Sequence, residues 1–256
     1  MNSRTLLVTG ASSKVGDALI RKIAGNYDTV FAHYNRGEEA VRALCESVKS
    51  DADLCSGGHD GESLRTVRII PVQADFADEE STRAMIDGIR GSGHTPSHVV
   101  HLSAVRASWK KFAKFSWEDY RAELDADLRP AVLLAQAFAP EMAKQKYGRF
   151  IFMLTAFTCG ADPKYMSPYI TAKYALLGLM KNLAAEYAEK NVHFHAVSPE
   201  MMDTPFVENV PETARRLAAE ASPSGVLLSP ETAAERIAFL LSGEADDRNG
   251  ENLYIR

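Results

Sequence analysis

Residues 6–16 read LLVTGASSKVG, a short apolar run that passes at once into a turn with two glycines. The run is typical of a buried strand, and a helix-like pattern begins at Val15. A glycine-containing turn between a strand and a helix lets the backbone approach a pyrophosphate closely, and the helix N-terminus supplies amide donors and a favourable dipole. The position of this turn, after the first strand and before a helix, predicts a nucleotide-binding site.

Beyond this turn, short apolar runs alternate with longer helical patterns to the end of the chain. The predicted strands are Leu6–Val8, Thr29–Ala32, Val67–Val72, His98–Val100, Phe150–Leu154, Val192–Val197 and Leu253–Ile255. The predicted helices are Val15–Ala24, Glu38–Val48, Ser81–Ile89, Trp117–Met142 and Tyr169–Ala188, with a last helical region after Val197. Apolar strands separated by helices are typical of a parallel sheet covered on both faces. The sequence therefore predicts an α/β fold, a single-domain, Rossmann-like, doubly wound parallel sheet of about seven strands.

Two segments stand apart from this alternation. The segment from Ser50 to about residue 66 is polar and contains glycine, which predicts a flexible surface insertion between the second helix and the third strand. Met201–Gly225 follows a strand end and mixes apolar, acidic and proline residues. Open α/β sheets bind ligands at the carboxyl ends of their strands, so this second segment is expected to form a lid over a substrate site.

Composition and charge exclude several classes of function. The 256 residues carry a net charge of -5, with Lys and Arg scattered, which argues against nucleic acid as a partner. No run is long enough to span a membrane and no signal peptide is evident, so we expect a cytoplasmic protein with no membrane partner. Cys45, Cys55 and Cys159 show no C-x-x-C pairing and suit reduced thiols.

The seven histidines show no metal-ligand spacing, and no metal is expected. His193 and His195 alternate along a predicted strand. We interpret them as packing or surface residues rather than as ligands.

The end of the second strand bears on cofactor choice. It reads Tyr34-Asn35-Arg36, without the acidic residue that would accept hydrogen bonds from an adenosine ribose and repel a 2′-phosphate. Arg36 can pair with a 2′-phosphate through charge-assisted hydrogen bonds. A lone arginine is also common as a solvated surface residue. The missing acid and the arginine together favour NADP (NADPH) over NAD.

A tyrosine and a lysine share a helix face after the fifth strand. Ser167-Pro168 is a typical helix start, with Ser at the cap and Pro at the first helical position. Tyr169 and Lys173 are then four residues apart, within reach of each other. A phenol is a poor acid at neutral pH, and a nearby ammonium lowers its pKa by stabilising the phenolate. Thr155, whose hydroxyl ends the fifth strand, stands 14 residues before Tyr169.

These motifs together resemble the short-chain dehydrogenase/reductase family, over essentially the whole chain and in order. Gly10 and Gly16 match the outer glycines of the family's T-G-x-x-x-G-x-G turn, while Lys14 stands where its middle glycine lies. The family's Y-x-x-x-K motif and upstream Ser correspond to Tyr169, Lys173 and Thr155. The stretch 195–200, HAVSPE, is similar to N-x-V-x-P-G, with Glu200 in place of the glycine. The resemblance is nearest to the 3-oxoacyl-carrier-protein reductase branch.

The resemblance implies a set of site residues. Thr155, Tyr169 and Lys173 would be catalytic, and Asp127 falls where the family's Asn supports a proton relay. Asp75 in Ala74-Asp75-Phe76 would contact the adenine, although a cap for the next helix is an alternative role. His101-Leu102-Ser103-Ala104 lies where the family carries N-N-A-G. The implied cofactor-binding residues are Gly10, Ser12, Ser13, Lys14, Val15, Gly16, Tyr34, Asn35, Arg36, Asp75, Phe76, Ser103, Ala104, Tyr169, Lys173, Pro199 and Thr204.

The function expected on these grounds is NADPH-dependent reduction of a small-molecule carbonyl to an alcohol. Two alternatives stay open: an NADP-binding protein without activity, and an NAD-dependent alcohol dehydrogenase. The family commonly forms homodimers or homotetramers, and Ala131–Ala139 is apolar almost all round. We therefore expect the helix Trp117–Met142 to lie in a subunit interface, the alternative being a helix buried within one subunit.

Overall fold

Seven strands form one fully parallel sheet in a computed structural model that describes residues 4–55, 67–160 and 163–256. The order across the sheet is β3-β2-β1-β4-β5-β6-β7. The strands are β1 Thr5–Thr9, β2 Thr29–Tyr34, β3 Arg68–Gln73, β4 His98–His101, β5 Gly148–Met153, β6 Val192–Pro199 and β7 Asn252–Ile255. The predicted α/β fold is confirmed. The order reverses between β1 and β4, and such a switch point opens a crevice for ligands at the carboxyl ends of the strands.

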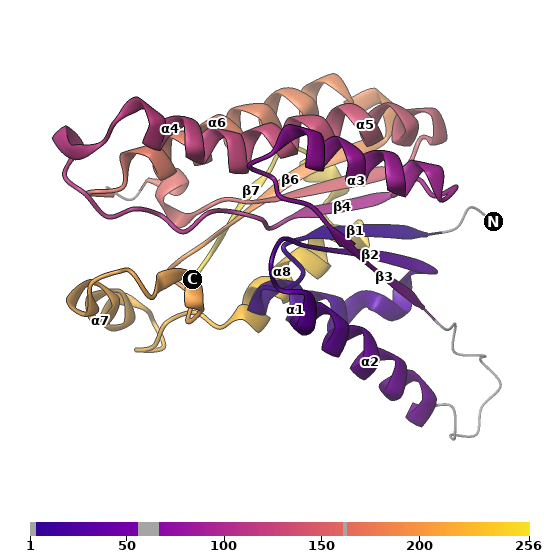
Figure 1. Cartoon of the computed structure of the whole chain (residues 1–256), viewed down its shortest axis with the longest axis horizontal. Coiled ribbons are helices and arrows are strands. Elements are labelled where there is room, and N and C mark those ends of the chain that lie inside the picture. The colour runs from indigo at the N-terminus through magenta and orange to yellow at the C-terminus, as the bar shows by residue number, and fades with distance from the viewer. Residues whose placement is uncertain (1–3, 56–66, 161–162) are drawn as a thin grey trace.

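Helices cover both faces of the sheet (Figure 1). One layer contains α1 Lys14–Ile23, α2 Glu38–Cys55 and α8 Pro230–Ser242; the other contains α3 Glu79–Gly91, α4 Trp117–Glu123, α5 Arg129–Gln145 and α6 Ser167–Glu186. Each layer has its own apolar core, around Leu19 and Ile237 on one face and Phe138 and Phe150 on the other. None of the helices in the described ranges is long and apolar enough to cross a membrane.

The predicted insertion after the second helix begins later than expected. Helix α2 runs to Cys55, so residues 50–55 are helical rather than part of a loop. Glutamates in its first turn and an apolar face that buries Val41 and Leu44 support the helix over its first turns. The remainder of the predicted insertion, residues 56–66, lies outside the described residues.

The predicted helix Trp117–Met142 contains a change of winding. Helices α4 and α5 follow each other through a π-helical turn, Leu124–Leu128, in which the amide of Arg129 donates to the carbonyl of Leu124. A π-turn inserts an extra residue into a helix and frees backbone carbonyls, and it is frequent at functional sites. Asp127 lies within this turn and is almost fully buried.

The apolar residues of α5 are buried by packing within a single chain. Leu134, Phe138 and Ala139 are fully buried, and Leu133 and Ala137 are only 7% and 8% exposed. The pattern that suggested a subunit interface is thus explained by packing onto the sheet and α3. Oligomeric state stays a prediction, which light scattering at micromolar concentration would test.

The segment Met201–Gly225 crosses the carboxyl end of the sheet. It contains the short helix Pro205–Val207 and α7 Glu212–Ala221, which projects from the body of the molecule (Figure 1). Met202 is joined to Leu228 by a parallel bridge, so both ends of the segment are anchored close together. The segment lies at the strand ends where open α/β sheets bind ligands, and its role as a lid stays a prediction.

Candidate active site

The turn between β1 and α1 requires both of its glycines. Gly10 has φ +68°, and a Cβ there would lie 3.2 Å from the amide nitrogen of Ser103. A Cβ on Gly16 would lie 2.6 Å from the carbonyl oxygen of Gly10, so no larger residue fits without displacing the backbone. Ser13 caps the helix, its hydroxyl oxygen accepting a hydrogen bond from the amide of Gly16 at 3.0 Å. The turn has the close strand-to-helix approach that phosphate binding needs.

Three amides of this turn remain available to a ligand. Within the described residues, the amides of Ser12, Lys14 and Val15 donate to no protein acceptor. The Lys14 side chain does not lie along the turn. Its ammonium donates to the carbonyl oxygen of Asp203 at 3.3 Å, connecting the turn to the lid segment. The role of Lys14 in cofactor binding stays a prediction, since its backbone amide remains open to a ligand while its side chain contacts Asp203.

The end of β2 lies directly beside this turn. The ring of His33 accepts a hydrogen bond from the amide of Gly10, and the carbonyl of His33 accepts one from the amide of Ala11. Two residues beyond Asn35, Gly37 packs so closely on Ser12 that a Cβ would lie 2.5 Å from the serine side chain. Arg36 is exposed and makes no ion pair within the described part of the chain. Arg36 thus directly precedes the residue that packs on the turn, and its guanidinium is free to meet an anion.

Asp75 and Phe76, which follow β3, make contacts within the protein that support the local fold. The cap of α3 is Asp78, whose carboxylate accepts from the amide of Glu80, so Asp75 is not the helix cap. The Asp75 carboxylate accepts from the amide of Ala77, and its own amide donates to Ser81. The Phe76 ring is buried and stacks on His33 with ring centroids 4.1 Å apart. Its side chain therefore packs beneath the nucleotide turn, because His33 is hydrogen-bonded to Gly10.

His101, at the end of β4, connects the nucleotide turn to the π-turn. The hydroxyl oxygen of Thr9 accepts from the amides of Leu102 and Ser103, so the hydroxyl proton is donated to Nδ1 of His101, 3.0 Å away. The other ring nitrogen then donates to the backbone carbonyl of Asp127 at 3.1 Å. Burial lowers the pKa of His101 to about 4, so the ring is neutral. Ser103 and Ala104 follow at the mouth of the site.

The three residues predicted to be catalytic, Thr155, Tyr169 and Lys173, lie close together, between the carboxyl end of β5 and the first turns of α6. Tyr169 and Lys173 lie one turn apart on the buried face of α6, and the lysine nitrogen is 5.6 Å from the centre of the tyrosine ring. Thr155 is 7% exposed, and its hydroxyl lies close enough to Tyr169 to act toward lowering the pKa of that phenol. A phenol, a hydroxyl and an ammonium therefore share one small, largely dry region, as general acid catalysis requires.

The start of α6 differs from the expected cap. The helix begins at Ser167, and the preceding Met166 occupies the cap position without a side-chain hydrogen bond. The Ser167 hydroxyl instead bonds the hydroxyl of Tyr120 on α4 at 2.8 Å. Pro168 lies in the first helical turn, where its missing amide costs nothing.

Lys173 forms a buried ion pair with Asp127. Its ammonium lies 2.9 and 3.1 Å from the two carboxylate oxygens and donates to the carbonyl of Met153 at 3.0 Å. Burial alone would lower the pKa of Lys173, but the negative groups around it, Asp127 foremost and then Tyr169 and Glu123, together hold that pKa above its usual range. Burial raises the pKa of Tyr169, and Lys173 opposes that rise without cancelling it. In the protein alone, Tyr169 is thus a protonated acid beside a permanent cation.

Glu123, which sequence reasoning missed, belongs to this group. It is 6% exposed and lies one helical turn before Asp127. Burial, together with the charge of Asp127, raises the pKa of Glu123 to about 8. Glu123 also lines a surface cavity of about 210 Å³ together with Arg106, Asp119 and Pro168. The only sequence signal was its spacing of four from Asp127.

The predicted lid segment, Met201–Gly225, lies against Tyr169. The ring of Phe206 is 6.0 Å from that of Tyr169, and Glu208 pairs with Arg106 at 3.1 Å. Pro199 ends β6, and Thr204 precedes the short helix of the lid. The carboxylate of Glu200 accepts from the hydroxyl of Tyr254 at 2.6 Å, so it is held against β7.

Comparisons with known proteins find similarity over most or all of the chain. The family described as enoyl-(acyl carrier protein) reductase matches residues 60–256. Oxidoreductase UcpA of Salmonella typhimurium is 28% identical, covering 100% of this chain and 94% of that protein. The 3-oxoacyl-[acyl-carrier-protein] reductase FabG of Thermotoga maritima is 25% identical, covering 100% and 97%. A crystal structure of a 3-oxoacyl-[acyl-carrier protein] reductase with bound NAD from Brucella melitensis superposes with a TM-score of 0.81 at 21% identity, covering 98% and 89%.

Proposed function

The chain belongs to the short-chain dehydrogenase/reductase family, and from that membership we propose that it reduces a ketone or 3-oxoacyl-type carbonyl to an alcohol with NADPH. The observation that carries the proposal is the meeting of Thr155, Tyr169 and Lys173 beside the switch point of the sheet. Relatives named as 3-oxoacyl reductases support the substrate class.

The residues present fit a nicotinamide dinucleotide. The free amides of Ser12, Lys14 and Val15 and the start of α1 suit a pyrophosphate, and Arg36 suits a 2′-phosphate. Asp75, Ser103 and Ala104 lie along the same edge of the sheet, and Lys173 is available to a ribose hydroxyl. When bound, the cofactor supplies the hydride.

The protein's own groups then act on the carbonyl oxygen. Tyr169 donates its phenolic proton to that oxygen, and the Thr155 hydroxyl donates a hydrogen bond to the same atom. Lys173 stabilises the phenolate left behind, and Asp127 keeps the lysine charged and oriented. Phe206 and the lid segment exclude water above the reacting atoms.

A carbonyl panel assayed with NADPH and NADH tests the proposal. Oxidation of NADPH that depends on a ketone or 3-oxoacyl thioester is the expected result. NADPH binding without turnover across the panel would instead support a non-catalytic protein. Turnover only with NAD and an alcohol would identify the dehydrogenase alternative.

Arg36→Ala is expected to remove most of the preference for NADPH. One charge-assisted contact to a 2′-phosphate contributes roughly 1.5–3 kcal/mol, or about 10- to 100-fold in affinity. Wild-type protein should therefore bind NADPH at least about tenfold tighter than NADH, and less so at high salt because Arg36 is exposed. Fluorescence titrations of both cofactors measure the ratio, with Arg42→Ala as a control, since Arg42 is paired to Glu38 on α2. An unchanged ratio in Arg36→Ala would exclude Arg36 as its cause.

Thr155→Val is expected to lower kcat by about 10²-fold, the loss typical of one hydrogen-bond donor to a developing oxyanion. Valine keeps the shape of threonine and removes the hydroxyl, so folding should be little affected. Thr155→Ser, which restores the hydroxyl, should stay active and is the matched control. Equal kcat values for wild type and the valine variant would contradict a role for this hydroxyl.

We further propose a cytoplasmic location and a homodimer or homotetramer. The thiol of Cys159, which forms no disulfide within the described residues, supports a reducing compartment. The homodimer or homotetramer is proposed because members of the family commonly form such assemblies.

A further inference from the structure

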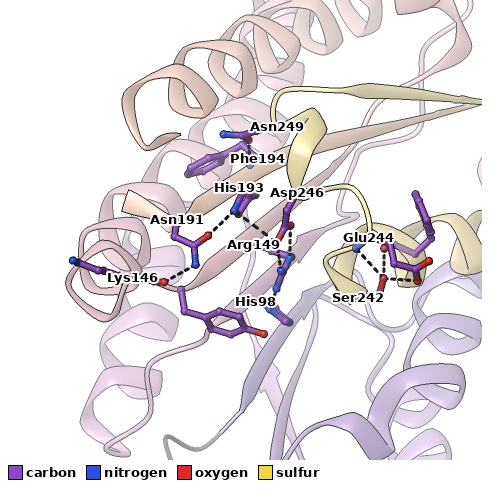
Figure 2. Close-up of polar contacts among 12 residues, drawn as sticks. His98, Lys146, Arg149, Asn191, His193, Phe194, Ser242, Glu244, Asp246 and Asn249 are labelled. Carbon is purple, nitrogen blue, oxygen red and sulfur yellow. Dashed lines mark hydrogen bonds and ion pairs between the residues drawn. The ribbon is translucent and has the colours of Figure 1, made fainter. Parts of the chain in front are cut away.

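A second polar cluster lies around the start of β6 (Figure 2), whereas Thr155 and Tyr169 follow the carboxyl end of β5. His193 and His195 are on the same face of β6 near its start, with rings parallel to within 3°. Asp246, from the short helix Asp246–Arg248 that follows α8, faces them. One ligand atom of each residue lies within 4.8 Å of the others. Two imidazoles and a carboxylate thus converge from two separate segments.

Three of the four imidazole nitrogens in this cluster lack a hydrogen bond within the described residues. His195 is 0% exposed, and both of its ring nitrogens are buried without a hydrogen bond. Nδ1 of His193 is in the same condition, while its Nε2 bonds the side-chain oxygen of Asn191 at 3.0 Å. A buried nitrogen without a partner costs stability, and its usual explanation is an ion or a water molecule. One ion can bind one nitrogen of each ring, so the two rings together offer two nitrogens to a common ligand.

We propose that His193, His195 and Asp246 bind a divalent transition metal ion, Zn²⁺ in the first instance, with water as the fourth ligand. Imidazole nitrogen and carboxylate oxygen are ordinary zinc ligands. Bond lengths of about 2.0–2.1 Å place two ligands of a tetrahedral zinc roughly 3.4 Å apart. Nε2 of His193 is 3.8 Å from the Asp246 carboxylate. To bind the ion it gives up its hydrogen bond to Asn191, and the ring proton moves to Nδ1.

Arg149 holds the carboxylate in place for this role. It donates to both oxygens of Asp246, at 3.0 and 2.5 Å, and to a ring nitrogen of His98 (Figure 2). A carboxylate has about four lone-pair positions, so two remain for a metal. The guanidinium charge opposes a second cation, and we therefore expect micromolar rather than nanomolar affinity. The Asp246 and His193 side chains are 31% and 12% exposed, which gives the ion a path from solvent.

Bound metal would fasten the segment after α8 to the sheet. That segment is already docked through Asn249, which accepts from the amide of Phe194 and donates to the carbonyl of Ala184. The role is structural, since the cluster is at the amino ends of the strands, away from Thr155 and Tyr169. It is therefore independent of the proposed reduction.

The test uses the full chain without an affinity tag, with Cys159→Ser to remove the exposed thiol, stripped of metal by a chelator. Titration with Co²⁺ should give visible absorption that saturates at one ion per chain, and Zn²⁺ should displace it. Thermal unfolding should shift upward with Zn²⁺. His195→Ala and His193→Ala should each abolish the Co²⁺ absorption. His94→Ala, which removes a histidine outside the cluster, should leave it unchanged.

If His195→Ala does not fold, His193→Ala still tests the proposal. The His193 ring is partly exposed, so its loss should disturb the packing of the protein less than loss of the buried His195 ring. Absence of saturable Co²⁺ absorption in wild-type protein overturns the proposal and leaves buried water as the partner of these rings. Absorption that persists in His193→Ala also overturns it, because the ion would then bind elsewhere.

Discussion

Tyr169→Phe is expected to abolish measurable turnover of a carbonyl substrate while leaving NADPH binding nearly intact. The phenolic hydroxyl is the proton donor in the proposed reaction, and loss of a positioned general acid lowers rates by about 10²- to 10⁴-fold. The ring is buried and stays packed in the variant, because phenylalanine removes only the oxygen. Steady-state NADPH oxidation measures the first effect, and fluorescence titration with NADPH measures the second.

Tyr174→Phe is the matched control for this experiment. Tyr174 lies on the same helix, is 48% exposed, and donates its hydroxyl to the carbonyl of Phe157. Its loss should leave kcat within about twofold of wild type, as for most exposed substitutions. Retention of most activity in Tyr169→Phe would falsify the assignment of the acid.

The pKa of Tyr169 gives the direction of the expected pH dependence. Burial raises that pKa, and the hydroxyl therefore carries its proton through neutral pH in the protein alone. Carbonyl reduction needs the protonated form, so its rate should stay level through neutral pH and fall at alkaline pH. Oxidation of the alcohol needs the phenolate, so its rate should rise with pH instead.

The sheet and the catalytic spacing were predictable because local patterns determine them. Buried parallel strands produce continuous apolar runs such as Phe150–Leu154, and a tyrosine and a lysine four apart must share a helix face. The glycine turn was predictable for the same reason, since Gly10 and Gly16 are required by backbone geometry alone.

Long-range partners were not predictable in this way. Lys14 meets Asp203, 189 residues away, and nothing near Lys14 in the sequence indicates it. Glu123 sits among several acidic residues of an ordinary-looking helix, and only the π-turn and α6 bury it beside Asp127 and Lys173. Likewise Ser167 matched a helix cap by residue type, but Tyr120 competes for its hydroxyl.

The largest effect on stability is expected at the Asp127–Lys173 ion pair. The two side chains are only 1% and 2% exposed, so Asp127→Ala would leave an unpaired ammonium in the interior. Breaking a buried pair in this way destabilises proteins by about 3–5 kcal/mol. Urea unfolding followed by circular dichroism measures the loss. Asp125→Ala is the matched control, since Asp125 lies in the same π-turn but pairs with Arg129 near the surface, and its loss should be below about 1 kcal/mol.

The double variant Asp127→Leu/Lys173→Met separates the structural role of this pair from its chemical role. Replacing both members of a buried ion pair by apolar residues is often neutral or stabilising, because two desolvated charges disappear together. The double variant should therefore be more stable than Asp127→Ala and show a coupling free energy above about 1 kcal/mol. It should also be inactive, since it lacks the cation that stabilises the Tyr169 phenolate. Additive losses of stability would contradict this picture, because the two charges would then act independently. A folded, inactive double variant would mean that the buried charges are retained for the proton transfer at Tyr169.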